Sequence, residues 1–272
     1  MIKAAVLGSP IAHSLSPLLH TIAYAELGIE GEYTRVEIKS GELSKFLSSC
    51  DDSWTGLSLT MPLKEEVLDL TQDVSDLARR IRSANTLVKR QGVWSASTTD
   101  VSGFTHALAA HGIDSCGDVL IIGGGATARA AAAACDGIAS RITVMNRSQS
   151  RIEALSNAVE SSDLDFIAWD DANIFESVDL IISTTPKGAS DSLIASFPSH
   201  PTGVFFDVLY NPWPTLALET WGKRGAQIID GLDLLIHQGI DQVSLFSGMR
   251  IDRAPMAALM RKHALIALGS ST

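Results

Sequence analysis

Residues 118 to 148 carry the pattern with the clearest chemistry: an apolar strand, a glycine-rich turn, an alanine-rich helix and a second apolar strand. The turn and the start of the helix comprise Gly123, Gly124, Gly125, Ala126 and Thr127. The first glycine can take the tight turn after a buried strand, and the third lets backbone N–H groups approach a pyrophosphate at the positive end of the helix. This spacing predicts a dinucleotide site, although such glycines also occur as plain packing turns.

The residues after the second strand indicate which dinucleotide is preferred. That strand is expected to end at Met145, where enzymes that read a free ribose 2′-OH usually carry Asp or Glu. Here Asn146, Arg147 and Ser148 follow instead. A carboxylate would repel a 2′-phosphate, whereas the guanidinium of Arg147 would bind one. The pattern favours NADP over NAD, with a solvated surface arginine as the alternative for Arg147 alone.

A second set of polar residues lies in the first hundred positions, where the chain leaves predicted strands. They are Ser14, Ser16, Thr60, Lys64, Asn85 and Asp100. Several of them have an ordinary alternative role at this point. Ser16 precedes Pro17 and could cap a helix, Asp100 could do the same, and a lysine such as Lys64 is more often exposed than catalytic.

The elements that would position these residues form two α/β units. In the first, strands are predicted at 4–7, 33–38, 56–60, 86–89 and 93–96, and helices at 17–27, 43–49, 63–70 and 74–82. Gln91 and Gly92 join the last two strands as a hairpin. In the second, strands are predicted at 119–122, 142–145, 165–168, 179–183, 204–208 and 227–229, which alternate with helices as in a doubly wound Rossmann sheet.

The predicted organisation is therefore α/β with two domains and a helical return. The boundaries are 1–102 for the first α/β domain, 103–238 for the Rossmann domain, and 239–272 for C-terminal helices that pack back across both domains. Two domains joined in this way are expected to leave a cleft for a small substrate.

Composition excludes several other classes. The chain has 272 residues and a formal net charge of −10, which disfavours nonspecific nucleic-acid binding. No apolar run reaches the length of a membrane span, so we expect a cytoplasmic protein without a membrane partner. Three widely spaced cysteines and seven ungrouped histidines offer neither a disulfide framework nor a metal site.

The order of the motifs resembles one family. Ser-Leu-Ser-Pro, Leu-Thr-Met-Pro-Leu-Lys, Ala-Asn-Thr, Thr-Thr-Asp, the glycine turn and Asn-Arg-Ser follow one another as in shikimate dehydrogenases of the biosynthetic, NADP-linked kind. Segments 207–215 and 231–238 extend the match, so that it covers nearly the whole chain.

The resemblance implies reversible reduction of 3-dehydroshikimate to shikimate by a monomer or homodimer, with Lys64 and Asp100 as the catalytic pair. Ser14 and Ser16 would bind the ring carboxylate. The remaining implied substrate residues are Ser58, Thr60, Asn85, Tyr210 and Gln238. The implied cofactor residues are Gly123, Gly124, Gly125, Ala126, Thr127, Asn146, Arg147, Ser148 and Gly231. The first domain would then bind the substrate and the second NADP.

Three positions depart from the family pattern. Ser58 stands where the family generally has Asn, Thr98 replaces an Asn before Thr-Asp, and Ala126 replaces the second residue of a glycine pair. Ser58 can still donate a hydrogen bond, but over a shorter reach. Segment 183–189 also differs from the usual run and is predicted only as a loop near the nicotinamide.

Three alternatives stay open. An NAD-linked quinate or shikimate dehydrogenase would be expected to carry an acidic residue in place of Asn146 and often a threonine in place of Ser16. A methylenetetrahydrofolate dehydrogenase shares the two-domain plan but needs different substrate motifs. A noncatalytic shikimate- or NADP-binding sensor would keep the fold, but has no need of both Lys64 and Asp100.

Overall fold

A computed structural model of the chain describes residues 1–169 and 171–269. Contacts between Cα atoms divide it into two compact units, one made of Met1–Gly103 with Leu235–Thr272 and the other of Phe104–Leu234. The last three residues of the predicted C-terminal segment lie outside the described residues. The C-terminal helices group with the first unit by this measure, and the predicted domain boundaries stay a proposal.

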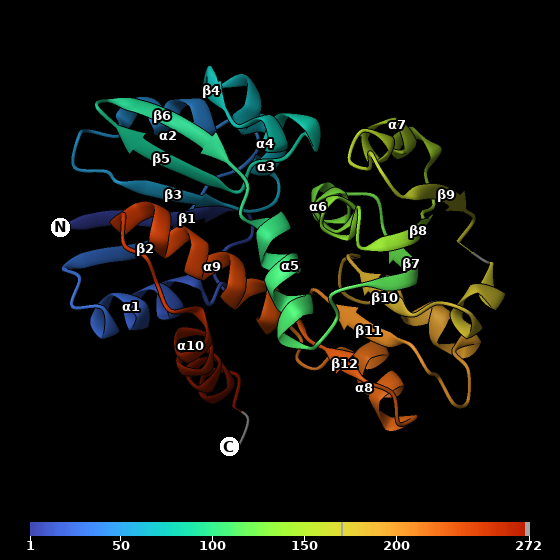
Figure 1. The fold of residues 1–272 in the computed structure, drawn as a ribbon. Helices are drawn as coiled ribbons and strands as arrows, with labels where there is room; N and C mark the ends of the chain where they lie inside the picture. The colour runs from blue at the N-terminus through green and yellow to red at the C-terminus, as the bar shows by residue number, and fades with distance from the viewer. Residues whose placement is uncertain (170, 270–272) are drawn as a thin grey trace. The chain divides into compact units, whose positions relative to one another are not determined.

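The first unit contains a six-stranded mixed sheet (Figure 1). Its strand order is β2-β1-β3-β5-β6-β4, in which β1 pairs in parallel with β2 and β3 while β5 runs antiparallel to both β3 and β6. The strands are β1 (Ile2–Gly8), β2 (Gly31–Glu37), β3 (Gly56–Leu59), β4 (Asp73–Val74), β5 (Thr86–Arg90) and β6 (Val93–Ser97). Five of the six were predicted within two residues at each end.

The hairpin between β5 and β6 is confirmed, because Gln91 and Gly92 both have positive φ, at 50° and 81°. Two positive φ values make the turn that matches the twist of antiparallel strands. The short strand β4 was missed. The sequence predicts a helix from Val74, whereas the helix starts only after Ser75, whose hydroxyl caps it by accepting from the Ala78 N–H at 3.3 Å.

Helices accompany this sheet in the first unit. They are α1 (Ser16–Glu26), α2 (Leu43–Ser49), α3 (Leu63–Glu66) with a 3-10 turn at Val67–Asp69, α4 (Asp76–Arg80) and α10 (Arg253–Ala267). Two longer helices, α5 (Asp100–Ala110) and α9 (Gly231–Ser247), each cross a boundary between the units along the chain. The predicted start of the C-terminal helices at Gly239 was wrong, since α9 begins eight residues earlier and Gln238 lies within it.

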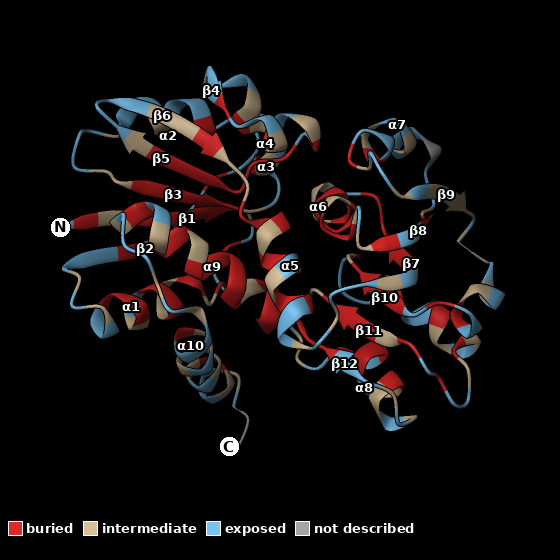
Figure 2. Cartoon of the chain, viewed as in Figure 1, coloured by how far each residue is buried: buried red, intermediate tan, exposed pale blue. Residues whose placement is uncertain are grey.

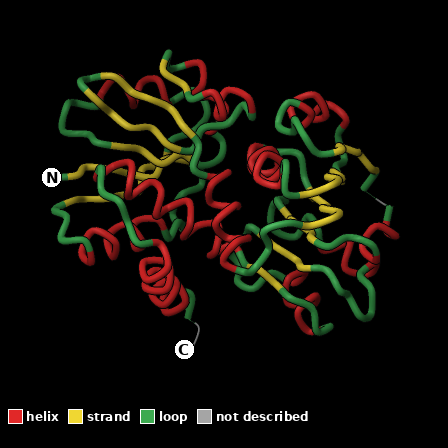
Figure 3. The backbone as a smooth tube through the Cα atoms, in the orientation of Figure 1, coloured by secondary structure: helices red, strands yellow, loops and turns green. Residues whose placement is uncertain are grey.

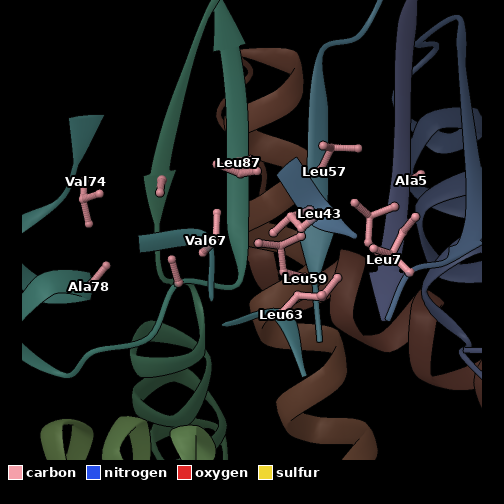
Figure 4. Packing of buried hydrophobic residues seen from close by; sticks show 13 residues of the cluster. Ala5, Leu7, Leu43, Leu57, Leu59, Leu63, Val67, Val74, Ala78 and Leu87 are labelled. Carbon is pink, nitrogen blue, oxygen red and sulfur yellow. The ribbon is translucent and has the colours of Figure 1, made fainter. Parts of the chain in front are cut away.

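The core of the first unit forms where apolar side chains of the sheet meet those of the helical segments (Figure 4). Strands β1, β3 and β5 contribute Ala5, Leu7, Leu57, Leu59 and Leu87, while Leu43, Leu63 and Val67 come from helical segments. Most of these are completely buried. Leu63, the residue before Lys64, is therefore anchored in the core and fixes the start of α3.

The second unit has a parallel six-stranded sheet, whose strands are yellow in Figure 3. Its strand order is β12-β11-β10-β7-β8-β9 (Figure 1). Its strands are β7 (Cys116–Ile122), β8 (Ala139–Met145), β9 (Asp163–Ile167), β10 (Leu180–Ser183), β11 (Val204–Asp207) and β12 (Ile228–Ile229). The order reverses between β7 and β10, which is the arrangement of the Rossmann fold. The predicted doubly wound sheet is confirmed, and its strand ends differ from the prediction by three residues at most.

Helical segments surround this second sheet. They are α6 (Ala126–Cys135), α7 (Ile152–Ser156), α8 (Leu216–Lys223) and the 3-10 turns Gln149–Arg151, Ala172–Glu176 and Asp191–Ser196. Figure 2 shows the inner strands and α6 as mainly buried. On α8, the Trp221 side chain is fully buried beside Phe197 and Phe205, and its indole N–H donates to the Gly203 carbonyl at 3.0 Å. An aromatic cluster therefore fixes the β11 side of the sheet.

Candidate active site

A lysine–carboxylate pair lies within the first unit. The Nζ of Lys64, the second residue of α3, is 2.6 Å from Oδ2 of Asp100, the first residue of α5. Their side chains are 14% and 5% exposed. A mostly buried ammonium keeps some access to solvent here, while its counter-charge is almost completely enclosed. Such a pair can present a proton and a positive charge to a bound oxyanion.

Asn85 holds the other oxygen of this carboxylate. Its Nδ2 donates to Oδ1 of Asp100 at 2.8 Å and to Oε1 of Gln238 at 3.2 Å. Its Oδ1 accepts from the backbone N–H of Thr99 at 2.7 Å. Asp100 is therefore fixed on both sides, and the structure brings three of the predicted residues together around Lys64. Thr99 is a partner that the sequence did not single out.

The sheet register explains why these residues meet. Ser58 of β3 pairs with Thr86 of β5, so that the carboxyl end of β3 lies beside the start of β5. The backbone N–H of Leu59 donates to the Asn85 carbonyl at 2.7 Å, and that of Ala84 donates to the Lys64 carbonyl at 2.9 Å. These bonds tie the segment before β5 to the start of α3. Residues separated by 36 positions are thereby placed in one site.

Ser14 and Ser16 stand at the start of α1 and are 4% and 8% exposed. The Oγ of Ser14 accepts from the Ser16 N–H at 3.3 Å, and the Ser14 carbonyl accepts from Nε of Arg35 at 3.0 Å. The alternative role of Ser16 as a helix cap is wrong, because Leu15 occupies the cap position and no side chain caps this helix. The Ser16 hydroxyl therefore does not cap the helix, which was the alternative to ligand binding.

Ser58 and Thr60 lie at the end of β3 and just beyond it. The Ser58 hydroxyl is buried between two side chains: it accepts from the Tyr33 hydroxyl at 2.6 Å and donates to Oε1 of Gln242 at 2.7 Å. It has no proton left for a substrate in this arrangement. Thr60 makes backbone bonds to Leu7 and Leu63, at 2.9 Å each, which hold the turn that leads into α3.

The glycine turn of the second unit follows β7 at the point where the strand order reverses. Gly123 has φ of 117°, and a Cβ there would lie 2.5 Å from Oγ1 of Thr184. A Cβ on Gly124 would lie 2.5 Å from Nδ2 of Asn146. Gly125 occupies the cap position of α6, with open space around its Cα. The positive φ requires glycine at the first position, and the third leaves backbone N–H groups at the helix start open to a ligand.

Ala126 and Thr127 are the first two residues of α6. The helix is built largely of alanines, of which Ala128, Ala130, Ala131 and Ala132 have no exposed surface. Small side chains let the helix pack closely against β7 and β8. The start of the helix is thereby fixed next to the glycine turn.

The three residues after β8 form a compact exposed turn. The Oδ1 of Asn146 accepts from the Arg147 N–H at 2.9 Å, and its Nδ2 donates to the Ser148 carbonyl at 2.9 Å. The guanidinium of Arg147 lies over the ring of Trp169, 5.2 Å from its centroid. Stacking of this kind orients a planar cation and leaves its edge for hydrogen bonds.

Arg151 is a second cation at this turn that the sequence analysis did not select. Its Cβ lies 3.1 Å from the place of a Cβ on Gly124. The signal that could have found it is its spacing, four residues after Arg147 and close to the same strand end. Arg151 therefore lies beside Gly124, whose other neighbour is the side chain of Asn146, the residue before Arg147.

Tyr210 and Gly231 both belong to the second unit, near the end of β11. A Cβ on Gly231 would lie 2.4 Å from the Val208 carbonyl oxygen, so glycine is required at the start of α9. Tyr210 follows Asp207 in a loop whose start is held by that carboxylate. Burial raises the pKa of Asp207 to about 6, against the opposing effect of hydrogen bonds from Thr215 and the Leu209 N–H.

Neither a metal site nor a membrane span is found in the described residues. Within 1–169 and 171–269, no group of three or more His, Cys, Asp or Glu side chains could hold a metal ion. No helix in the same ranges is long and apolar enough to cross a bilayer.

Comparisons with known proteins agree with this geometry. The profile described as shikimate dehydrogenase substrate binding domain matches residues 6–87, and the profile described as shikimate / quinate 5-dehydrogenase matches residues 107–195. Shikimate dehydrogenase (NADP(+)) from Ignicoccus hospitalis is 33% identical over 250 residues, covering 90% of this chain and 92% of that protein.

Solved structures give the same result. Shikimate dehydrogenase from Mycobacterium tuberculosis has a TM-score of 0.88 at 32% identity, with 96% of this chain and 100% of that one covered. The enzyme from Thermus thermophilus, solved in complex with NADP(H) and shikimate, has a TM-score of 0.85 at 31% identity, with 96% and 99% covered. The predicted two-domain α/β fold and the predicted resemblance are both confirmed. Two matching profiles and relatives similar over nearly the whole length establish that the chain belongs to the shikimate dehydrogenase family.

Proposed function

We propose that this chain is an NADP-dependent shikimate dehydrogenase that reversibly reduces 3-dehydroshikimate to shikimate. The observation that carries the proposal is the Lys64–Asp100 pair, 2.6 Å apart and braced by Asn85. The Lys64 ammonium can stabilise the substrate carbonyl oxygen, which gains negative charge and then a proton during reduction. A small polar substrate without a nucleic-acid or membrane partner agrees with the acidic composition.

The test is the consumption of NADPH, followed by its absorbance, on addition of 3-dehydroshikimate. Turnover with NADPH and little with NADH is the expected result. Binding of both ligands without turnover would favour the noncatalytic sensor instead. Turnover mainly with NADH and quinate would favour the catabolic dehydrogenase. We further propose a cytoplasmic location. We also propose a monomeric or homodimeric state, which gel filtration with light scattering tests.

The catalytic roles follow from the charge that develops during reduction. NADPH, when bound, supplies the hydride to the carbonyl carbon. Negative charge then grows on the carbonyl oxygen, and the Lys64 ammonium stabilises it and donates a proton to it. Asp100 holds that ammonium in place from one oxygen, while Asn85 holds Asp100 from the other. In the oxidative direction Lys64 receives the proton.

Substrate recognition is assigned to the other polar side chains that the resemblance implies. Ser14 and Ser16, buried at the start of α1, would donate to the ring carboxylate. Thr60, Asn85 and Gln238 would hold the ring hydroxyls, since Asn85 and Gln238 already contact each other beside Asp100. Tyr210 is proposed as a further substrate residue.

The second unit fits the NADP nucleotide. The pyrophosphate would lie on the turn from Gly123 to Thr127, where Gly125 leaves open space at the start of α6. Arg147 would bind the 2′-phosphate, with Asn146 and Ser148 shaping the turn that carries it. No acidic side chain occupies the end of β8, which agrees with a phosphorylated ribose. Gly231 would leave room near the nicotinamide.

Replacement of either Ser14 or Ser16 by Ala is expected to raise the KM for shikimate with little change in kcat. The ring carboxylate is distant from the reacting carbon, so its hydrogen bonds act similarly in ground and transition states. Steady-state kinetics with parallel melting curves measure this. Ser75→Ala is the matched control, because it removes a true helix cap: it should lower stability by about 1 kcal/mol and leave KM unchanged. An unchanged KM in both site variants would refute the carboxylate role.

Arg147→Ala is expected to weaken binding of NADP(H) by roughly 1.5 to 3 kcal/mol, the range for hydrogen bonds to a charged group, and to leave NAD(H) binding nearly unchanged. The reason is that NADP(H) carries a 2′-phosphate for the guanidinium to bind, whereas NAD(H) has none. Titration calorimetry with both cofactors measures the difference. Arg250→Ala, at another exposed arginine, serves as the control for net charge. Equal losses for the two cofactors would contradict the phosphate role.

A further inference from the structure

We propose that Gln242 is a positioning residue for the catalytic pair, which it orients through Thr86 and Asn85. The proposal rests on the proposed function, because it takes Lys64 and Asp100 as the groups that act on substrate. Gln242 lies on α9, one helical turn after Gln238. That spacing puts both amides on the same face of the helix, since residues four apart are neighbours there.

A continuous chain of side-chain hydrogen bonds runs from Tyr33 to the catalytic carboxylate. The Tyr33 hydroxyl donates to Ser58 Oγ at 2.6 Å, and Ser58 Oγ donates to Gln242 Oε1 at 2.7 Å. Gln242 Nε2 donates to Thr86 Oγ1 at 3.0 Å, and Thr86 Oγ1 donates to Asn85 Oδ1 at 2.9 Å. Asn85 Nδ2 then donates to Asp100 Oδ1 at 2.8 Å. Every link joins two side chains of the first unit.

The direction of the chain is set at its catalytic end. The Asp100 carboxylate can only accept, so Asn85 must present its NH2 group to it and its oxygen to Thr86 and to the Thr99 N–H. The Thr86 hydroxyl therefore donates to Asn85 and is left to accept from the NH2 group of Gln242. The Gln242 oxygen must then accept from Ser58. Reversal of any one link would place two donors or two acceptors against each other.

Burial disfavours any other arrangement of these hydrogen bonds. Ser58, Thr86, Asn85 and Gln242 are 4%, 0%, 2% and 1% exposed, so water does not replace a lost partner easily. Gln242 uses all of its hydrogen-bonding groups, because Nε2 also donates to the Asn85 backbone carbonyl at 3.2 Å. The helix α9 thus holds Asn85 by its side chain, through Thr86, and by its main chain directly.

The start of the chain is uncharged and tightly packed. The Tyr33 ring stacks on His20, with centroids 3.8 Å apart. Burial lowers the pKa of His20 to about 3, and the nearby Gln242 side chain offsets this only in part. The Ser58 hydroxyl gives its single proton to Gln242. This explains how a serine can stand where the family generally has Asn: its hydroxyl serves the interior network, and its substrate role stays a prediction.

The expected effect of breaking the chain is a loss of kcat. Gln242→Leu and Thr86→Val should each lower kcat by about 5- to 20-fold, the effect of one or two lost hydrogen bonds, and change the KM for shikimate by less than about threefold. The two should be less than additive when combined, because they remove neighbouring links of one chain. Thr86→Ser, which retains the hydroxyl, should restore most of kcat.

A purely structural role for Gln242 makes different predictions. Val243→Ala, at the next and equally buried position of α9, is the matched control: it should lower the melting temperature and leave kcat within twofold of the wild type. If Gln242→Leu does not fold, the nearly isosteric Thr86→Val carries the test. Folded variants whose kcat falls no further than that of Val243→Ala would overturn the proposal.

A second measurement separates this proposal from the proposed function. The side-chain NH2 protons of Asn85, detected by NMR in the ligand-free protein, should exchange slowly with solvent and should exchange at least about tenfold faster in Thr86→Val. A wild type without turnover would defeat the proposed function, and Asn85 exchange would still report whether the network positions it. Unchanged Asn85 exchange in Thr86→Val and Gln242→Leu would overturn the positioning role.

Discussion

Lys64→Ala is expected to lower kcat by about 10²- to 10⁴-fold, the usual contribution of a general acid or base. The variant removes the ammonium that lies 2.6 Å from Asp100 and with it both the charge and the proton for the substrate oxygen. NADPH binding should survive, because the glycine turn and Arg147 belong to the other unit. Single-turnover absorbance measurements with a parallel NADPH titration separate the two effects.

The control for this variant is Lys45→Ala, at an exposed lysine of α2. It should retain kcat within about twofold of the wild type, since an exposed surface charge contributes little. A folded Lys64→Ala protein with near-normal turnover would remove the catalytic assignment and bring the sensor hypothesis forward.

The outline of both units could be predicted from local patterns. The strands of the second unit are short apolar runs between helices, and burial on both faces makes such runs stand out in the sequence. The glycine turn could be placed because only glycine tolerates φ of 117° beside Thr184. Polar residues at strand ends could be selected because the chain turns there.

The errors have physical causes. Strand β4 has only two residues, and its pairing with β6 is a long-range contact that leaves no local pattern. The start of α9 at Gly231 depends on a tertiary contact, because the close approach of the Val208 carbonyl requires a glycine at that helix start. Tertiary contacts outweighed local preference in both cases.

The candidate site divides in the same way. The sequence selected Lys64, Asp100 and Asn85, and the structure places them within hydrogen-bond distance. It did not select Gln242, whose partner Ser58 lies 184 positions away. A polar side chain on the buried face of an apolar helix, four residues from Gln238, was the available signal. Its meaning depends on contacts that only the folded chain supplies.

Asp100→Asn is expected to lower kcat by about 10²- to 10³-fold, although the side chain keeps its shape. The carboxylate now accepts from Lys64 on one oxygen and from Asn85 on the other. An amide at this position would point its NH2 group at one of these two donors in either orientation, and the site has no third arrangement. Lys64 would lose its orienting charge in both orientations, and either Lys64 or Asn85 would also lose its acceptor.

The double variant Lys64→Ala/Asp100→Asn tests whether the pair acts as a unit. If Asp100 works by holding Lys64, the double variant should be little slower than the slower single variant, because loss of the ammonium leaves the carboxylate nothing to orient. The measurement is kcat for shikimate oxidation in all four proteins, with melting temperatures as the check on folding. Losses that multiply would show that the two residues act independently. A helix-end role for Asp100 alone would instead lower stability and leave kcat of the Asp100→Asn protein within a few-fold of the wild type.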